Sequence, residues 1–214
     1  KNMFKSRQIF NFDFLFDDIS NKYDIFDWES FNDKAKKYEV VATDVITGES
    51  KFFDKNNCSD IISAVKASAS MPVMSKMIDV EGRKYLDGGI STSIAYKRAF
   101  DVGYSKAIVV LTREEGYRKK PVNKINESIY KRYFKPLPNL VEKLMTVPER
   151  YNKMQEEMEE LAKEGKLLII RPQNKVTVQR LEHSSVKLEK LYNEGYEVGS
   201  KNIENIKNFI ALKF

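Results

Sequence analysis

The sequence predicts a mixed α/β fold with a mostly parallel sheet flanked by helices, and three observations support this. Residues 83–111 have the order strand, glycine turn, helix and buried strand, which is the order of a βαβ unit. The apolar runs 107–111 and 167–170 have the length of strands buried on both faces, as parallel strands are. Between these runs, apolar residues from Val147 to Leu161 recur at helical spacing.

The first half of the chain is predicted to form two hairpins separated by a helix. The helix should begin after Ser59 or Asp60 and end before Pro72, because a proline disfavours helix in the residue ahead of it. A tight turn at Glu81-Gly82 would place Asp79 opposite Lys84. A short helix is expected at 27–35, and strands are expected at 38–43, 51–53, 76–80 and 83–86. Residues 3–19 are rich in Phe and Ile and should pack on a core.

In the second half, Gly103 is expected to end a helix that begins at Ile94. Pro136 and Pro138 should stop a short helix in the segment 113–135, and a longer helix should then run from Val147 to Gly165. Two more helices are expected, one starting at Ser184 or Ser185 and one carrying Ile203, Ile206, Phe209 and Ile210.

Length and composition favour one globular α/β domain over residues 1–214, since hydrophobic residues make up 42% of the chain and charged residues 32%. No apolar run approaches the roughly 18 residues of a membrane helix. The chain begins with Lys1 and shows no signal-peptide pattern, so we expect a cytoplasmic protein and a sequence that starts inside a longer one. The oligomeric state cannot be predicted.

The net charge of +6 has two interpretations: a solubilising surface, or attraction to an anionic partner such as a phospholipid surface or nucleic acid. The charge is concentrated in residues 113–135, where eight Lys and Arg stand against three Glu and aromatic residues are interleaved. This segment is either an ordinary solvated loop and helix or an element that faces a membrane or gates a substrate.

A metal or disulfide is not expected. Cys58 is the single cysteine and His183 the single histidine, and a zinc site needs about three or four such ligands. No other cofactor is indicated. His183 lies among polar residues and is expected at the surface or as a capping residue.

Asp87, in the segment Asp87-Gly88-Gly89, is the candidate catalytic residue. A carboxylate at a strand end beside two glycines could act as a general base for a nucleophile on a neighbouring loop. The alternative is structural, because Asp-Gly is a common turn pair whose carboxylate bonds nearby amides. The expected position at the carboxyl edge of a parallel sheet favours function.

The chain itself offers no nucleophile motif. It lacks both G-x-S-x-G and a glycine-rich phosphate or oxyanion loop. Two S-x-x-K matches, Ser63 with Lys66 and Ser184 with Lys187, have no companion motifs and are interpreted as coincidences. Ser68 and Ser70, just ahead of Pro72, are expected to cap or pack.

Taken together, these motifs resemble the bacterial patatin-like phospholipases. The resemblance covers most of residues 12–121 and is carried by the segments 12–17, 40–44, 47–48, 67–72, 85–89, 109–113 and 116–121. It implies a patatin-like α/β fold, incomplete at the N-terminus, and a Ser-Asp dyad that acts on acyl esters of the phospholipase or lysophospholipase type. In that family the serine and the oxyanion loop lie upstream of the D-G-G motif, here Asp87, Gly88 and Gly89.

The resemblance therefore implies an enzyme of lipid metabolism of which this chain is about the C-terminal two-thirds, inactive by itself. Its substrate would be an acyl-ester lipid, peripheral contact with an anionic membrane is left open, and nucleic acid is not expected. The rival hypothesis is a non-catalytic basic module that binds anionic lipid or nucleic acid.

Overall fold

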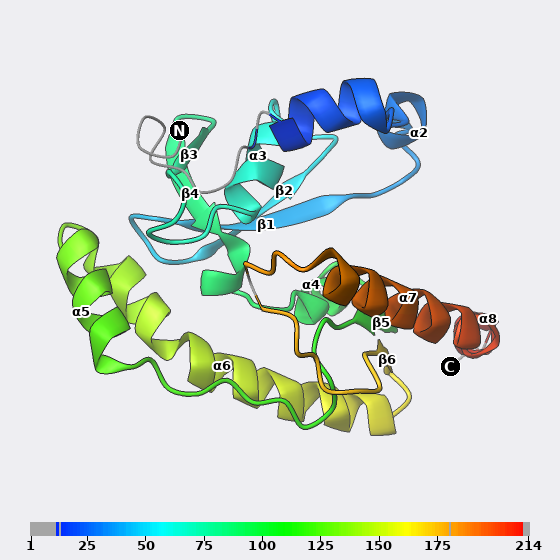
Figure 1. The fold of residues 1–214 in the computed structure, drawn as a ribbon. Helices are drawn as coiled ribbons and strands as arrows, with labels where there is room; N and C mark the ends of the chain where they lie inside the picture. The colour runs from blue at the N-terminus through cyan, green and yellow to red at the C-terminus, as the bar shows by residue number, and fades with distance from the viewer. Residues whose placement is uncertain (1–11, 13, 180, 212–214) are drawn as a thin grey trace. The chain divides into compact units, whose positions relative to one another are not determined.

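The computed structural model describes residues 12, 14–179 and 181–211 and confirms a mixed α/β fold (Figure 1). The chain divides into two compact units, residues 1–94 with 121–149 and residues 95–120 with 150–214. The long helix α6, Pro138–Lys163, contributes to both. The prediction of one domain over 1–214 stays a prediction. The apolar segment 3–19 lies partly outside the described residues, and a π-helix, η1, covers Phe14–Tyr23.

The first unit contains a four-stranded sheet in the order β2-β1-β4-β3, and all of its neighbouring strands are antiparallel. The prediction of a mostly parallel sheet is therefore wrong. Two hairpins build this sheet, and their short connections can join only antiparallel strands. The strands are β1 Glu39–Asp44, β2 Ser50–Asp54, β3 Ile78–Val80 and β4 Arg83–Asp87.

The second hairpin has the predicted register, with Asp79 paired to Lys84. Its turn residues Glu81 and Gly82 both have positive φ, at 53° and 79°. Two such residues in succession give the turn type whose twist suits a two-residue hairpin. The Glu-Gly pair thus determines both the turn and the register.

Side chains on the two faces of this sheet enter two different apolar clusters. Tyr85 packs with Phe53 and with Ala64 and Ala67 of helix α3 (Ile61–Ser68). Leu86, one residue later, faces the opposite side because strand side chains alternate. There it joins the buried Phe134, which follows α5 (Lys124–Tyr133), and Leu140 and Leu144 from the first part of α6.

Helix boundaries follow the expected capping residues in most places. The side chain of Asp60 accepts from the Ser63 N–H and caps α3, and Ser184 caps α7 (Ser185–Lys201) in the same way. Further short helices are α2 (Trp28–Asn32), α4 (Tyr96–Asp101) and α8 (Ile203–Ala211). The largest difference is at the start of α6, which is Pro138 rather than Val147, because a proline fits the first turn of a helix, whose N–H groups have no partner within the helix. The helix expected from Ile94 begins at Tyr96, and the one expected over 27–35 ends at Asn32.

The second unit contains a parallel pair, β5 Ala107–Val110 and β6 Leu167–Ile170, with Val110 opposite Ile170. In the described residues β5 pairs with β6 and not with β4, so the predicted βαβ unit over 83–111 is wrong. Full burial of β5 is also wrong, since Val109 is 7% exposed but Val110 is 73% exposed. An apolar run predicts a strand, but the run alone does not tell whether one face of that strand or both faces are buried.

Helices α4 and α6 are joined by the carboxylate of Glu157, which accepts from Tyr96 Oη and pairs with Lys97 Nζ, each at 2.6 Å. These bonds, that to Lys97 first, lower the pKa of Glu157 from 4.5. Burial and the nearby carboxylate raise the pKa of Tyr96, so its hydroxyl stays a donor. The contacts of Glu157 with Tyr96 and Lys97 therefore stabilise the fold only while Glu157 is ionised.

Replacing Glu157 with glutamine should lower the free energy of unfolding at pH 7 by about 1 kcal/mol, a value that allows for the one-third exposure of the side chain. Since the folded-state pKa is the lower one, this contribution is complete above about pH 4.5 and is lost as the pH falls through the folded pKa. Urea unfolding at several pH values would measure it. Glu160→Gln, in an exposed pair with Lys163, is the control and should change little; a Glu157 effect that persists at acid pH would contradict the assignment.

Candidate functional site around Asp87

Asp87 is the last residue of β4, a central strand of the antiparallel sheet, and its main chain is held on both sides. Its N–H donates to the Ser70 carbonyl at 2.9 Å, and its own carbonyl accepts from Thr43 Oγ1 at 2.8 Å. Because the sheet is antiparallel, the predicted location at a parallel carboxyl edge is wrong. The residue nevertheless stands where the strand ends and a new turn begins.

The carboxylate of Asp87 caps the short 3-10 helix η2, Gly88–Ile90. Its Oδ1 accepts from the Gly89 N–H at 2.7 Å, and the side chain is half-buried. A hydrogen bond from a main-chain amide fixes the position of one oxygen of the carboxylate. The arrangement fits both interpretations of the motif, a turn cap and an oriented base.

Gly88 is required by space rather than by an unusual φ. A Cβ built on Gly88 would lie 2.2 Å from the Val41 carbonyl oxygen and 2.7 Å from Val41 Cγ1. At Gly89 the nearest atom to such a Cβ is Asp87 Oδ1, at 3.0 Å. The first glycine thus lets η2 lie directly against β1, and the second leaves room for the capping carboxylate.

Two hydroxyl residues to which the sequence assigned no role at the site, Thr43 and Ser91, support this turn. Thr43 is fully buried, and its Oγ1 bonds Ser91 Oγ at 2.8 Å and accepts from the Ser91 N–H at 3.1 Å. With its bond to the Asp87 carbonyl, this hydroxyl joins β1, β4 and the end of η2. Thr43 stands in a β-branched strand run, so its sequence signal was that of any strand residue.

Asp44, next to Thr43, is a buried carboxylate with a structural role. Its Oδ1 accepts from the N–H groups of Ile46 and Thr47, and its Oδ2 lies 2.8 Å from Arg83 Nη2. These contacts shape the β1–β2 turn and tie it to β4. Asp44 was noticed only as part of the family resemblance, since local sequence cannot show that Arg83 reaches it.

The serines considered as nucleophiles have local structural roles. Ser70 is buried, and its Oγ donates to the Lys66 carbonyl at 2.8 Å, which agrees with a packing role. Ser184 is the N-cap of α7 and accepts from the Lys187 N–H. Ser63 lies in the first turn of α3, and its N–H bonds Asp60. His183 is exposed, as expected.

The described part of the chain contains neither a metal-binding cluster nor a membrane-spanning helix. No group of three or more His, Cys, Asp or Glu among the described residues could hold a metal ion. No helix among them is both long and apolar enough to cross a bilayer.

A family model described as "Domain of unknown function (DUF6363)" matches residues 137–211. The match spans α6, β6, α7 and α8 and leaves out Asp87, Gly88 and Gly89. No curated protein matches the chain. The similarity therefore concerns the C-terminal part, and the description attached to it assigns no chemistry.

Proposed function

We propose that this chain supplies the general base, Asp87, of a Ser-Asp dyad in an acyl-ester hydrolase of the phospholipase or lysophospholipase type. The observation that supports the proposal is the geometry of the D-G-G turn. A carboxylate at a strand end is oriented by the Gly89 amide at 2.7 Å, on a turn where Gly88 has no room for a side chain.

In this reaction the Asp87 carboxylate takes the proton of a serine hydroxyl as the serine attacks the ester carbonyl. The leaving alcohol then departs with a proton returned from Asp87. Asp87 next takes a proton from water as that water attacks the acyl-serine, and it returns this proton to the departing serine oxygen, which releases the fatty acid and restores the serine hydroxyl. The patatin resemblance implies that the serine and the oxyanion donors belong to a segment upstream of these 214 residues, and the patatin-like fold is part of this proposal.

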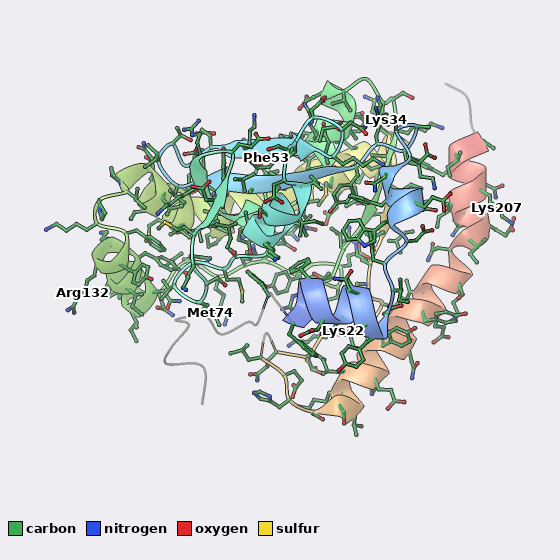
Figure 2. All side chains as sticks on the ribbon, turned by 90° about the horizontal axis from the view of Figure 1, so that it is seen from above. Lys22, Lys34, Phe53, Met74, Arg132 and Lys207 are labelled. Carbon is green, nitrogen blue, oxygen red and sulfur yellow. The ribbon has the colours of Figure 1, made fainter. Side chains whose placement is uncertain are left out.

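The exposed face of α5 supports contact with a lipid surface. Ile125, Ile129 and Tyr133 follow one another at helical spacing and are 72%, 41% and 57% exposed. Arg132 borders this stripe, and Lys124 and Lys131 add positive charge elsewhere on the helix; Figure 2 labels Arg132, whose side chain is exposed. An apolar stripe bordered by cations is the pattern of a helix that lies at an anionic membrane surface. We propose that α5 is the membrane-facing element.

The isolated 214-residue chain should show no turnover of a chromogenic acyl ester above the uncatalysed rate, whereas the full-length protein should hydrolyse it. The reason is that the base without a nucleophile cannot form an acyl-enzyme. A matched assay of both proteins, with a fluorophosphonate probe to label the serine, measures this. Turnover by the isolated chain would place the nucleophile within it, and an inactive, unlabelled full-length protein would favour the rival binding module.

A further inference from the structure

Two buried hydrogen-bond donors in the second unit have no acceptor among the described residues. Gln155 is 3% exposed, yet its Nε2 has no hydrogen-bond partner there, and Arg171 Nη1 is also buried without one. An unsatisfied buried donor is costly, more so when it is charged, so native proteins contain few of them. Glu159 links the two donors, since Arg171 Nη1 lies 3.9 Å from its Oε1 and Gln155 comes one helical turn before it on α6. Two such donors beside one residue point to a ligand that accepts from both.

The main-chain positions place two arginines, Arg171 and Arg113, at the carboxyl ends of the parallel strands. Arg171 immediately follows β6, and Arg113 comes shortly after the end of β5. The strands stay paired up to this point, since the Leu111 N–H donates to the Ile170 carbonyl at 2.8 Å. The carboxyl ends of parallel strands are where α/β proteins bind ligands.

Helix α6 presents Tyr151, Gln155 and Glu159 at intervals of four residues, so they share one face. Arg171 Nη1 and Arg118 Nη2 each lie 3.9 Å from Glu159 Oε1. That distance is too long for a hydrogen bond, so Glu159 pairs with both guanidinium groups by charge without accepting a hydrogen bond from either of these nitrogens. Gln155 lies between Tyr151 and Glu159 on this face.

The loop after β5 adds cations beside Tyr151. The Arg113 guanidinium stacks 5.0 Å from the Tyr117 ring, and Lys119 Nζ lies 4.2 Å from the Tyr151 ring. Asn152 fixes this loop by bonding both the N–H and the carbonyl of Lys119. Burial raises the pKa of Tyr151, while Arg113, Arg171 and Arg118 act against it, so all three cations lie near this ring.

The described side chains of this cluster carry an excess of positive charge. The cations are Arg113, Arg118, Lys119 and Arg171. The carboxylates are Glu159, Glu114, which accepts from the Val176 N–H, and Glu194, which lines the hollow beside Arg171 and accepts from the Asn174 N–H. The cations therefore outnumber the carboxylates, which favours an anionic ligand. Arg171 in addition is a donor of the planar type that binds phosphate at two oxygens.

We propose that this cluster is a binding site for a phosphate group, held by Arg171, Gln155 and the cations of the 113–119 loop. The site is independent of Asp87 and of the proposed hydrolase activity. Arg171 also lines an apolar hollow of about 280 Å³ formed with Leu111, Ile170, Leu191 and Val198. A phosphate with an apolar tail and a free phosphate ion both offer the required oxygens.

The first experiment titrates inorganic phosphate into the full-length protein by calorimetry at constant ionic strength. Arg171→Met and Gln155→Met keep most of the side-chain volume but remove the donors, and each should weaken binding about tenfold or more. Lys153→Gln removes a charge from an exposed position of α6 and should bind like the wild type. Gln155→Met, which removes no charge, keeps the test valid if the Arg171 variant does not fold.

The second experiment separates the two sources of phosphate by sedimentation with vesicles of phosphatidylcholine, with and without phosphatidic acid. If Arg171→Met and Gln155→Met both weaken binding to vesicles with phosphatidic acid, the ligand is a lipid phosphate. If both substitutions weaken binding of inorganic phosphate but vesicle binding does not depend on them, the ligand is a small phosphate compound. Vesicle binding that neither substitution alters belongs to surface cations such as those of α5. The proposal would be overturned by that result if, in addition, the wild type binds no inorganic phosphate or both Arg171→Met and Gln155→Met bind it as the wild type does.

Discussion

Replacing Asp87 with asparagine should lower the kcat of the full-length protein for a chromogenic acyl ester by roughly 10³- to 10⁴-fold. The asparagine Oδ1 can still accept from the Gly89 N–H, which in the native chain lies 2.7 Å from the carboxylate. The turn should therefore stay intact while the ability to take a proton is lost. KM should change little, because Asp87 is proposed to act on the serine and on water rather than to bind the lipid.

The matched control for this substitution is Asp79→Asn in the preceding hairpin. Asp79 Oδ1 also accepts from a glycine, the Gly82 N–H at 3.1 Å, so the same chemical change is made at a structurally similar turn. Its kcat should stay close to that of the wild type. If Asp87→Asn and Asp79→Asn are equally active, the Asp87 carboxylate is a turn cap and the dyad assignment fails.

The second large effect is expected at Gly88, where alanine should reduce the free energy of unfolding by at least about 3 kcal/mol. The added Cβ would meet the Val41 carbonyl oxygen at 2.2 Å, and a main-chain atom of a central strand cannot move aside as a flexible side chain does. Either η2 separates from β1 or the strand distorts, and both outcomes break the bonds that Thr43 makes to the Asp87 carbonyl and to Ser91. Urea unfolding followed by circular dichroism would measure the change.

Two other glycines separate steric crowding from main-chain strain. Gly82 has φ of 79° and no atom within 4 Å of a built Cβ, so Gly82→Ala should cost only about 1 to 2 kcal/mol, for the left-handed conformation. Gly89→Ala would press on Asp87 Oδ1 at 3.0 Å and should reduce activity more than stability. A Gly88→Ala variant no less stable than Gly82→Ala would show that η2 and β1 are not so closely packed.

Much of the local structure could be predicted because short-range physics decides it. The Glu81-Gly82 pair determined a hairpin and its register, and Asp60 and Ser184 marked helix starts through their capping oxygens. The identity of Asp87 as the candidate residue also came from sequence, since a carboxylate followed by two glycines is a visible pattern. Each of these inferences concerns groups separated by only a few residues.

Pairing between distant strands could not be predicted in this way. The apolar run 107–111 suggested a strand but did not identify β6, much later in the chain, as its partner in the described sheet. The hydrogen bonds that hold the turn after Asp87 could not be predicted for the same reason, because Thr43 and Ser91 are 48 residues apart in the sequence. A strand's composition reports how well it packs, whereas its neighbours depend on which hairpins and helices compete for the same edge.

The sequence by itself determined the hairpins, the helix caps, the basic character of residues 113–135 and the D-G-G turn, because each depends on conformational preferences of adjacent residues. Only the tertiary structure decided that the main sheet is antiparallel and that Gly88 lies against Val41. It alone brought Arg171 and Arg118 to the same carboxylate, Glu159, and joined α6 to the 113–119 loop through Asn152 and Lys119. Contacts of this kind join residues far apart in the chain, and no local preference encodes them.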